Sequence, residues 1–207
     1  MTDSVSSPSP QPAADDAPRD HHVCPWWIGY LLASPLRRLV ERPETLLTPL
    51  VEPGMTAVDI GSAMGFFSLP LARLVGPEGR VVCVDVQQRM LTRLQKRARR
   101  KGLGDVIETR LCTQDSLGLD GLAGRVDIAL AFYVVHETAF PARFLGECRS
   151  VLRPGGHLLV AEPRGHVTVE EFERTLEMAR EAGFEVRDGH GPRRAHAALL
   201  EAGPLEP

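Results

Sequence analysis

The fold of this chain is decided by residues 58–67, Val58-Asp59-Ile60-Gly61-Ser62-Ala63-Met64-Gly65-Phe66-Phe67. An apolar strand pattern ends at the acidic Asp59, and small residues then lead the chain into a helix. Gly61 and Gly65 can adopt dihedrals that residues with a Cβ avoid, and they let a ligand approach the main chain. Asp59 is placed to accept hydrogen bonds from a cationic or amine-bearing ligand. The segment predicts the nucleotide-cofactor site of an open α/β sheet.

Short β-branched runs alternate with helical patterns after Pro53-Gly54, which is typical of parallel βαβ units. We expect strands at residues 56–60, 80–85, 106–112, 126–132 and 157–161, and helices at 44–51, 66–75, 87–101 and 141–152. A further helix is expected after the capping box that Thr168 and Glu171 form, with its apolar face beginning at Val169.

Two final strands are predicted at residues 184–188 and 196–200, joined by a turn around 189–192. The link is too short for a parallel crossover, so the pair must be antiparallel. The expected fold is α/β, a Rossmann-like, doubly wound, mostly parallel seven-stranded sheet with an antiparallel C-terminal strand.

The composition is that of an ordinary globular protein, with 207 residues, 43% hydrophobic and 25% charged positions and a formal charge of −3. This charge favours neither nucleic acid nor an anionic membrane as a partner. No apolar run reaches the roughly 18 residues of a membrane span, and no signal peptide is recognisable, so a cytoplasmic location is expected. The oligomeric state stays open. Residues 1–20 read as a disordered tail, 21–52 as an N-terminal helical lid and 53–207 as the cofactor-binding domain.

The four cysteines are widely spaced, and Cys83, Cys112 and Cys148 fall in strand or helix patterns where a small apolar side chain fits. We interpret these three as core thiols. Cys24 lies near two histidines, but no spaced second ligand pair follows, so no metal site is predicted.

The second strand pattern ends at Asp85, 20 positions after Gly65. A carboxylate at this strand tip reaches a ribose, whose two hydroxyls satisfy its two oxygens. A helix cap or a solvated charge is the alternative for a lone strand-end aspartate, but its distance from the glycine turn favours ligand binding.

The chain then resembles class I S-adenosylmethionine-dependent methyltransferases of the small-molecule type, which includes the ubiquinone and menaquinone biosynthesis enzymes. The resemblance covers roughly residues 43–201. It rests on the order and spacing of VDIGSAMG, VDV, Asp115 after the third strand, AFYVVHE and VLRPGGHLLVAEP.

The resemblance implies a bound S-adenosylmethionine. It assigns the methionine part to the first loop, the ribose to the second strand end and the adenine amino group to the loop after the third strand. The implied cofactor residues are Asp59, Gly61, Ser62, Gly65, Asp85, Gln114 and Asp115, and we add Phe132 at the end of the fourth strand. Ala63 departs from the family pattern, which usually has glycine there. We expect it to be tolerated if its backbone dihedrals are negative.

The segment after the fourth strand is where an acceptor should meet the methyl group. His136 is the candidate base and Glu137 its orienting or competing partner, although a histidine here could simply cap a helix or pack in the cleft. Glu162 and His166 are further candidates. Many methyltransferases act by proximity alone.

The substrate side is expected to include aromatic residues of the lid, which attract a sulfonium or enclose an apolar acceptor. They are Trp26, Trp27 and Tyr30, with Tyr133 after the fourth strand. Simple packing against the sheet is the alternative. Basic residues on one face of the second helix, Arg89, Arg93, Lys96, Arg97 and Arg100, read as a solvated outer face rather than a nucleic-acid site.

The sequence therefore predicts an enzyme that transfers a methyl group to a small molecule, without nucleic acid or membrane as a partner. Two alternatives are a nicotinamide-dependent oxidoreductase and a non-catalytic cofactor-binding subunit. The first should carry G-x-G-x-x-G, whereas Gly61, Ala63 and Gly65 are spaced by two.

Overall fold

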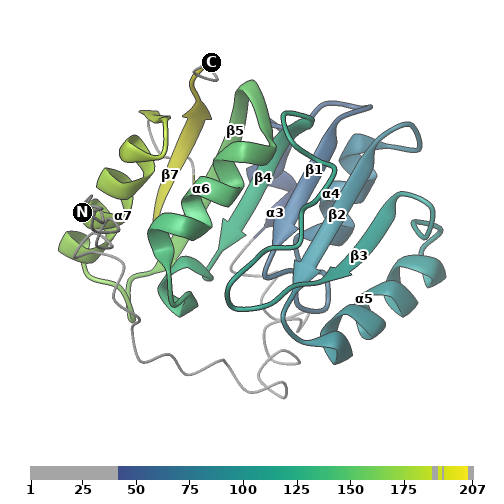
Figure 1. Cartoon of the computed structure of the whole chain (residues 1–207). Helices are drawn as coiled ribbons and strands as arrows, with labels where there is room; N and C mark the ends of the chain where they lie inside the picture. The colour runs from purple at the N-terminus through teal and green to yellow at the C-terminus, as the bar shows by residue number, and fades with distance from the viewer. Residues whose placement is uncertain (1–41, 188–190, 193, 205–207) are drawn as a thin grey trace, which may run out of the picture.

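The computed structural model describes residues 42–187, 191–192 and 194–204. A seven-stranded sheet runs through this part of the chain in the order β3-β2-β1-β4-β5-β7-β6 (Figure 1). Its strands are β1 (Thr56–Ile60), β2 (Arg80–Asp85), β3 (Ile107–Leu111), β4 (Val126–Phe132), β5 (Leu152–Pro163), β6 (Phe184–Arg187) and β7 (Ala195–Ala202). Strands β1 to β5 pair in parallel, and β7 runs antiparallel to both β5 and β6. The predicted sheet and its terminal hairpin are confirmed.

Helices cover both faces of the sheet (Figure 1). They are α3 (Pro43–Leu47), α4 (Ser68–Val75), α5 (Gln88–Arg100), the 3-10 turn η2 (Val135–Glu137), α6 (Pro141–Val151) and α7 (Val169–Glu181). Apolar residues of α6 and α7 share one core with the sheet, and those of α3, α4 and α5 share the other. The central strands are continuous apolar runs because both of their faces are buried.

Several details differ from the sequence prediction. The helix expected at residues 44–51 is the shorter α3, and the helix expected at residues 66–75 begins at Ser68. Strand β5 begins at Leu152, five residues before His157, because Leu152 already pairs with Val126 of β4. The capping box at Thr168 is present, but Val169 is 56% exposed. As the first residue of α7 it precedes the packed face, which starts one turn later at Phe172.

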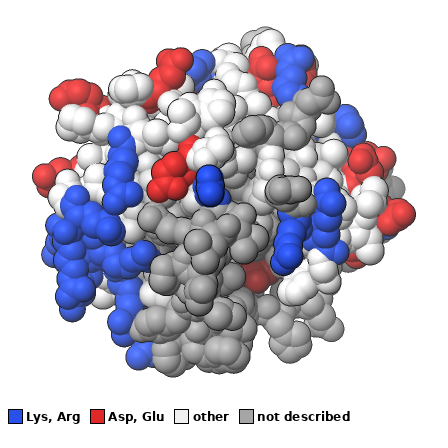
Figure 2. All heavy atoms as spheres, turned by 180° about the vertical axis from the view of Figure 1, so that it is seen from behind, with Lys and Arg blue, Asp and Glu red and all other residues white. Residues whose placement is uncertain are grey.

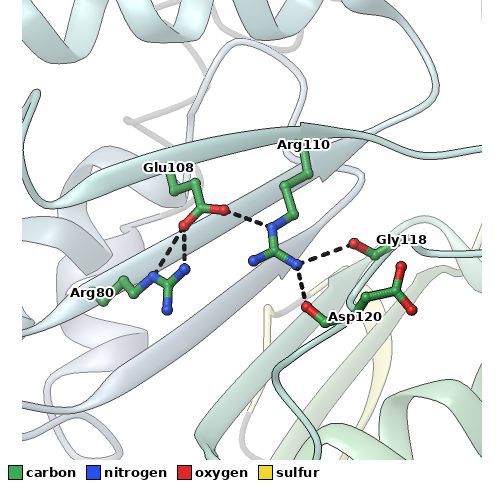
Figure 3. Close-up of polar contacts among 5 residues, drawn as sticks. All are labelled: Arg80, Glu108, Arg110, Gly118 and Asp120. Atoms are coloured by element: carbon green, nitrogen blue, oxygen red, sulfur yellow. Dashed lines mark hydrogen bonds and ion pairs between the residues drawn. The ribbon is translucent and has the colours of Figure 1, made fainter.

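A polar network fixes the edge strand β3 and the loop that follows it (Figure 3). Glu108 accepts from Arg80 Nε at 3.0 Å and from Arg110 Nε at 2.6 Å. Arg110 Nη1 also donates to the carbonyl oxygens of Gly118 and Asp120 at 3.2 and 3.0 Å. The β3–β4 loop, which carries Gln114 and Asp115, is thereby tied to the sheet.

Two of the three predicted core thiols are confirmed, because Cys83 and Cys148 are fully buried. Cys112 is only half-buried and borders a cavity, since it lies just beyond the end of β3. The tail, Cys24, Trp26, Trp27 and Tyr30 lie outside the described residues. In the described ranges no helix is both long and apolar enough to cross a membrane.

Candidate active site

A cavity of about 530 Å³ opens where the carboxyl ends of β1, β2 and β4 meet. Nearly all the site residues predicted within the described ranges border it: Asp59, Gly61, Ser62, Asp85, Gln114, Asp115, Phe132, Tyr133, His136 and Glu137. Gly65 belongs to the same loop, just beyond the bordering residues Ala63 and Met64. A ligand crevice at the carboxyl ends of parallel strands is the general location for binding in open α/β sheets.

The loop after β1 needs its glycines. Gly61 and Gly65 have φ of 69° and 81°, in the left-handed region. A Cβ at Gly61 would lie 3.1 Å from Val134 Cγ2, and one at Gly65 would lie 3.1 Å from Leu94 Cδ1. The loop therefore requires glycine at both positions for conformation and for space.

Ala63 adopts φ of 45°, so the expected condition of negative dihedrals is not met. Ala63 N donates a hydrogen bond of 2.9 Å to Asp85 Oδ2, which holds the loop against the end of β2. A residue with a Cβ is strained in this region, and the local hydrogen bond opposes the strain.

Asp59 is buried at the end of β1 and accepts a hydrogen bond from the Ser68 hydroxyl. Burial raises the pKa of Asp59 to about 7; the Ser68 bond opposes this rise, and the charge of Asp85 adds to it. A cation beside Asp59 would favour its ionised form. The group is suited to a positively charged ligand.

Asp85 uses both oxygens within the loop region. Its Oδ1 accepts from Gln87 N at 2.8 Å and its Oδ2 from Ala63 N at 2.9 Å. Burial raises the pKa of Asp85, and these two bonds partly offset the rise. Each carboxylate oxygen has a second lone pair, so the group can still accept from a pair of hydroxyls.

The Ser62 side chain gives an observation independent of the sequence pattern. It is 4% exposed and borders the cavity, and within the described part of the chain its Oγ has no hydrogen-bond partner. Buried polar groups are normally paired, so an orphaned hydroxyl beside a cavity indicates a ligand that completes it. The residues present therefore fit a polar cofactor in this loop.

The far end of the cavity is formed by the loop after β3. Gln114 and Asp115 are exposed there. The loop is shaped by two bonds between Thr113 and Ser116, of 3.0 Å from Thr113 N and 3.1 Å from Ser116 N. Cys112 shares this end, and burial raises the pKa of its thiol to about 11. The thiol is therefore neutral at physiological pH.

Arg97 is a site residue that the sequence did not reveal. Its Nη1 donates to the Met64 carbonyl oxygen of the glycine loop, so the prediction of a purely solvated side chain is wrong for Arg97. Arg97 lies three residues after the buried Leu94 on α5 and is itself half-buried. Its side chain can therefore reach the glycine loop. The other four basic residues of that face are exposed, and Figure 2 shows Lys and Arg side chains gathered on this side of the molecule.

His136 lies in η2 and is held by Glu162 rather than by Glu137. Its Nδ1 bonds Glu162 Oε2, while Glu162 Oε1 accepts from Val135 N at 2.8 Å. Of the two roles predicted for Glu137, the orienting contact belongs to Glu162, because strand register rather than sequence adjacency sets it. Glu137 acts on His136 through its charge. Phe132 of β4 pairs with Ala161 of β5, which brings the next residue of β5 beside the turn that follows β4.

Burial and the neighbouring charges shift the pKa of His136 in opposite directions. Burial alone would lower its pKa, but the hydrogen bond and charge of Glu162, with the charge of Glu137, outweigh burial and raise it. Burial raises the pKa of Glu137. The His166 ring meets the His136 ring edge to face, with centroids 6.0 Å apart. His136, Glu137 and His166 border the cavity, and Glu162 lies behind His136.

Aromatic residues form part of the cavity wall. Phe132 stacks on Phe67 with ring centroids 4.1 Å apart and planes 10° apart. Tyr133 has φ of 60°, and its N donates to Ala161 O at 2.7 Å. Ala63 and Tyr133 are the non-glycine residues with positive φ in the described ranges, and both border the cavity. Such outliers persist only where surrounding structure imposes them.

Comparison with known proteins gives one family and several distant relatives. The sequence model of a family described as a methyltransferase domain matches residues 51–190. An uncharacterised 37.1 kDa protein in transposon TN4556 of Streptomyces fradiae is 39% identical over 111 residues, 54% of this chain and 31% of that protein. A ubiquinone biosynthesis O-methyltransferase of Caulobacter vibrioides is 34% identical over 108 residues, 52% of this chain and 40% of that enzyme. This chain thus spans well under half the length of these two relatives.

Solved structures agree on the fold. A SAM-dependent methyltransferase from Aquifex aeolicus superposes with a TM-score of 0.77 at 23% identity, covering 87% of this chain and all of that one. The [4+2]-cyclase SpnF superposes with a TM-score of 0.64 at 21% identity, covering 80% of this chain and 82% of that one. At such identities the likeness shows the fold and leaves the reaction to be argued from the site.

Proposed function

The chain belongs to the class I S-adenosylmethionine-dependent methyltransferases, and from this premise we propose that it transfers the methyl group of S-adenosylmethionine to a small-molecule acceptor. One observation carries the proposal: the strained loop after β1, the buried Asp59 and Asp85 and the unpartnered Ser62 hydroxyl all face a single cavity. This set supplies what a cationic, hydroxyl-rich cofactor needs.

The cofactor residues divide by chemistry. Asp59, whose pKa is near neutrality, would pair with the positively charged methionine end. Asp85 would accept from the ribose hydroxyls, and Asp115 with Gln114 would meet the adenine. Ser62 and the backbone of Gly61 would complete the methionine part. When bound, the cofactor supplies an electrophilic methyl carbon on a sulfonium.

A small-molecule acceptor is supported by the acceptor end of the same cavity. Tyr133, His136 and Glu137 border it, beside Phe132, which stacks on Phe67. The Caulobacter relative is named as a ubiquinone biosynthesis O-methyltransferase, which supports an acceptor of this kind. Holding donor and acceptor in line within this cavity would supply most of the rate acceleration for methyl transfer.

Several sequence predictions stay proposals. The lid of residues 21–52 is one, with Trp26, Trp27 and Tyr30; its described part, residues 42–52, contributes the buried Leu47 to the core beside α4. The tail of residues 1–20 and the domain of residues 53–207 are others. The cytoplasmic location and the absence of nucleic-acid or membrane partners also stay predictions.

Release of S-adenosylhomocysteine tests the proposal. The wild-type protein is incubated with S-adenosylmethionine and a panel of small hydroxyl, thiol and amine acceptors, and the product is separated by chromatography. We expect acceptor-dependent release. Asp85→Asn should weaken cofactor binding by about tenfold or more, since hydrogen bonds to charged groups contribute roughly 1.5–3 kcal/mol. The exposed Asp120→Asn should leave it unchanged. Equal binding by both variants would remove Asp85 from the site, and tight binding without turnover would favour a non-catalytic subunit.

A further inference from the structure

We propose that Glu162 and His136 act as a proton-accepting pair, with Glu162 as the positioning residue, and that the pair selects acceptors whose nucleophilic atom carries a dissociable proton, such as a phenolic hydroxyl. The proposal rests on the proposed methyl transfer and names the acceptor class for the same site. It follows from contacts that the strand order creates rather than from the sequence pattern.

Both oxygens of Glu162 are committed. The side chain is 1% exposed; Oε1 accepts from Val135 N at 2.8 Å and Oε2 bonds His136 Nδ1. A carboxylate at Nδ1 fixes the tautomer that carries its proton there, which leaves Nε2 as the acceptor nitrogen. His136 borders the cavity and its side chain is 22% exposed. The basic nitrogen is therefore the one available to a ligand.

A purely structural role does not account for this arrangement. Burying a carboxylate costs several kcal/mol unless it is well paired, and an apolar pair of similar size is often at least as stable. Here the buried charge is paired with a side chain of the cavity wall instead of one in the core. The neighbouring positions of β5, from Leu158 to Ala161, are apolar and fully buried. Glu162 is the first polar residue after this apolar run, and the next residue, Pro163, borders the cavity.

The charged groups that face His136 come from three segments. Glu162 lies on β5, Glu137 on η2 beside the imidazole, and His166 on the loop between β5 and α7. The two glutamates strengthen the imidazole as a base, against the opposing effect of burial. His166 is exposed, and its ring meets that of His136 edge to face.

The chemical step balances with these groups. A lone pair of the acceptor oxygen forms the new bond to the methyl carbon, and the carbon–sulfur bond breaks with its electron pair going to sulfur. The acceptor proton moves to His136 Nε2, and the carboxylate of Glu162 stabilises the resulting imidazolium. An acceptor such as a tertiary amine or a thioether has no proton to lose, so the pair gives it no advantage. General-base catalysis of this kind contributes about 10²–10⁴-fold.

The test compares wild type, Glu162→Gln and His136→Gln by two readouts. The first follows the histidine ring signals by NMR during a pH titration without ligand, with His136→Gln used to assign the signal. We expect Glu162→Gln to lower the pKa of His136, because glutamine keeps an acceptor for Val135 N but removes the charge. The second measures turnover of catechol, a phenolic probe, against pH. We expect kcat to fall about 100-fold or more in both variants, with the dissociation constant of S-adenosylmethionine changed less than threefold.

Each outcome decides the proposal. An unchanged pKa of His136 in Glu162→Gln would overturn it, even if no acceptor turns over, because the pair would not exist in solution. Equal kcat and an unmoved pH profile in the variants would also overturn it. If Glu162→Gln fails to fold, His136→Gln carries the kinetic test alone, and full activity there overturns the proposal. Loss of cofactor binding in the wild type would instead refute the proposed function and leave the NMR result intact.

Discussion

Replacing Ala63 with glycine should stabilise the protein, against the usual effect of such a change. Ala63 is held at φ of 45°, and the left-handed region costs a residue with a Cβ roughly 1–2 kcal/mol. Glycine loses more conformational freedom on folding, a cost of about 0.5–1 kcal/mol. The midpoints of these two ranges differ by about 0.7 kcal/mol, which is the expected gain. The bond from residue 63 N to Asp85 survives because it uses the main chain.

Thermal unfolding followed by circular dichroism measures this gain. For a chain of this size about 1 kcal/mol corresponds to roughly 2–4 °C, so Ala63→Gly should raise Tm by about 1–4 °C. Ala123→Gly is the matched control, since Ala123 is an exposed loop residue without positive φ. It should lower Tm slightly, because glycine raises the conformational entropy of the unfolded chain. If Ala63→Gly lowers Tm as much as Ala123→Gly does, the strain attributed to the loop is absent.

Three further predictions concern the same loop. Burial raises the pKa of Asp59 to about 7, so its carboxyl group is mostly protonated at pH 6. Calorimetry should therefore show the affinity for S-adenosylmethionine rising between pH 6 and 8. Asp59→Asn should remove the part of this rise that comes from Asp59. Arg97→Ala, which removes the contact with the loop carbonyl, should weaken binding of the cofactor about fivefold in the same assay, corresponding to about 1 kcal/mol, whereas the exposed Arg100→Ala should not. Gly65→Ala should destabilise the fold by about 1–3 kcal/mol in urea unfolding, because φ is 81° and the new Cβ would lie 3.1 Å from Leu94 Cδ1; an unchanged midpoint would contradict the geometry.

Much of the fold was predictable because local signals agree with the tertiary structure. The bounds of β1, β2 and β4 match the sequence prediction, since each is a short apolar run that ends at a polar or glycine turn. The antiparallel hairpin followed from loop length alone. The start of β5 was missed because its first residues, Leu152 to Gly156, look like a helix stop and a turn. Only pairing with β4 makes them part of a strand.

Site residues were predictable from the sequence where the residue type itself indicates the role. Glycines with positive φ and carboxylates at strand ends are of this kind, and the structure brings Gly61, Asp59 and Asp85 to one cavity. The partner of His136 was not, because Glu137 is adjacent in sequence whereas Glu162 is adjacent in the sheet. A usable signal existed: Glu162 directly follows the apolar run from Leu158 to Ala161, in the strand next to the one that precedes His136. Pairing Glu162 with His136 required knowing that β5 lies next to β4.

Titration calorimetry with S-adenosylmethionine and, separately, with NAD tests the central claim most directly. We predict saturable binding of S-adenosylmethionine with one site per chain, weakened about tenfold or more by Asp85→Asn, and no heat with NAD. Saturable NAD binding with no heat from S-adenosylmethionine would contradict the assignment of this cavity to the methyl donor.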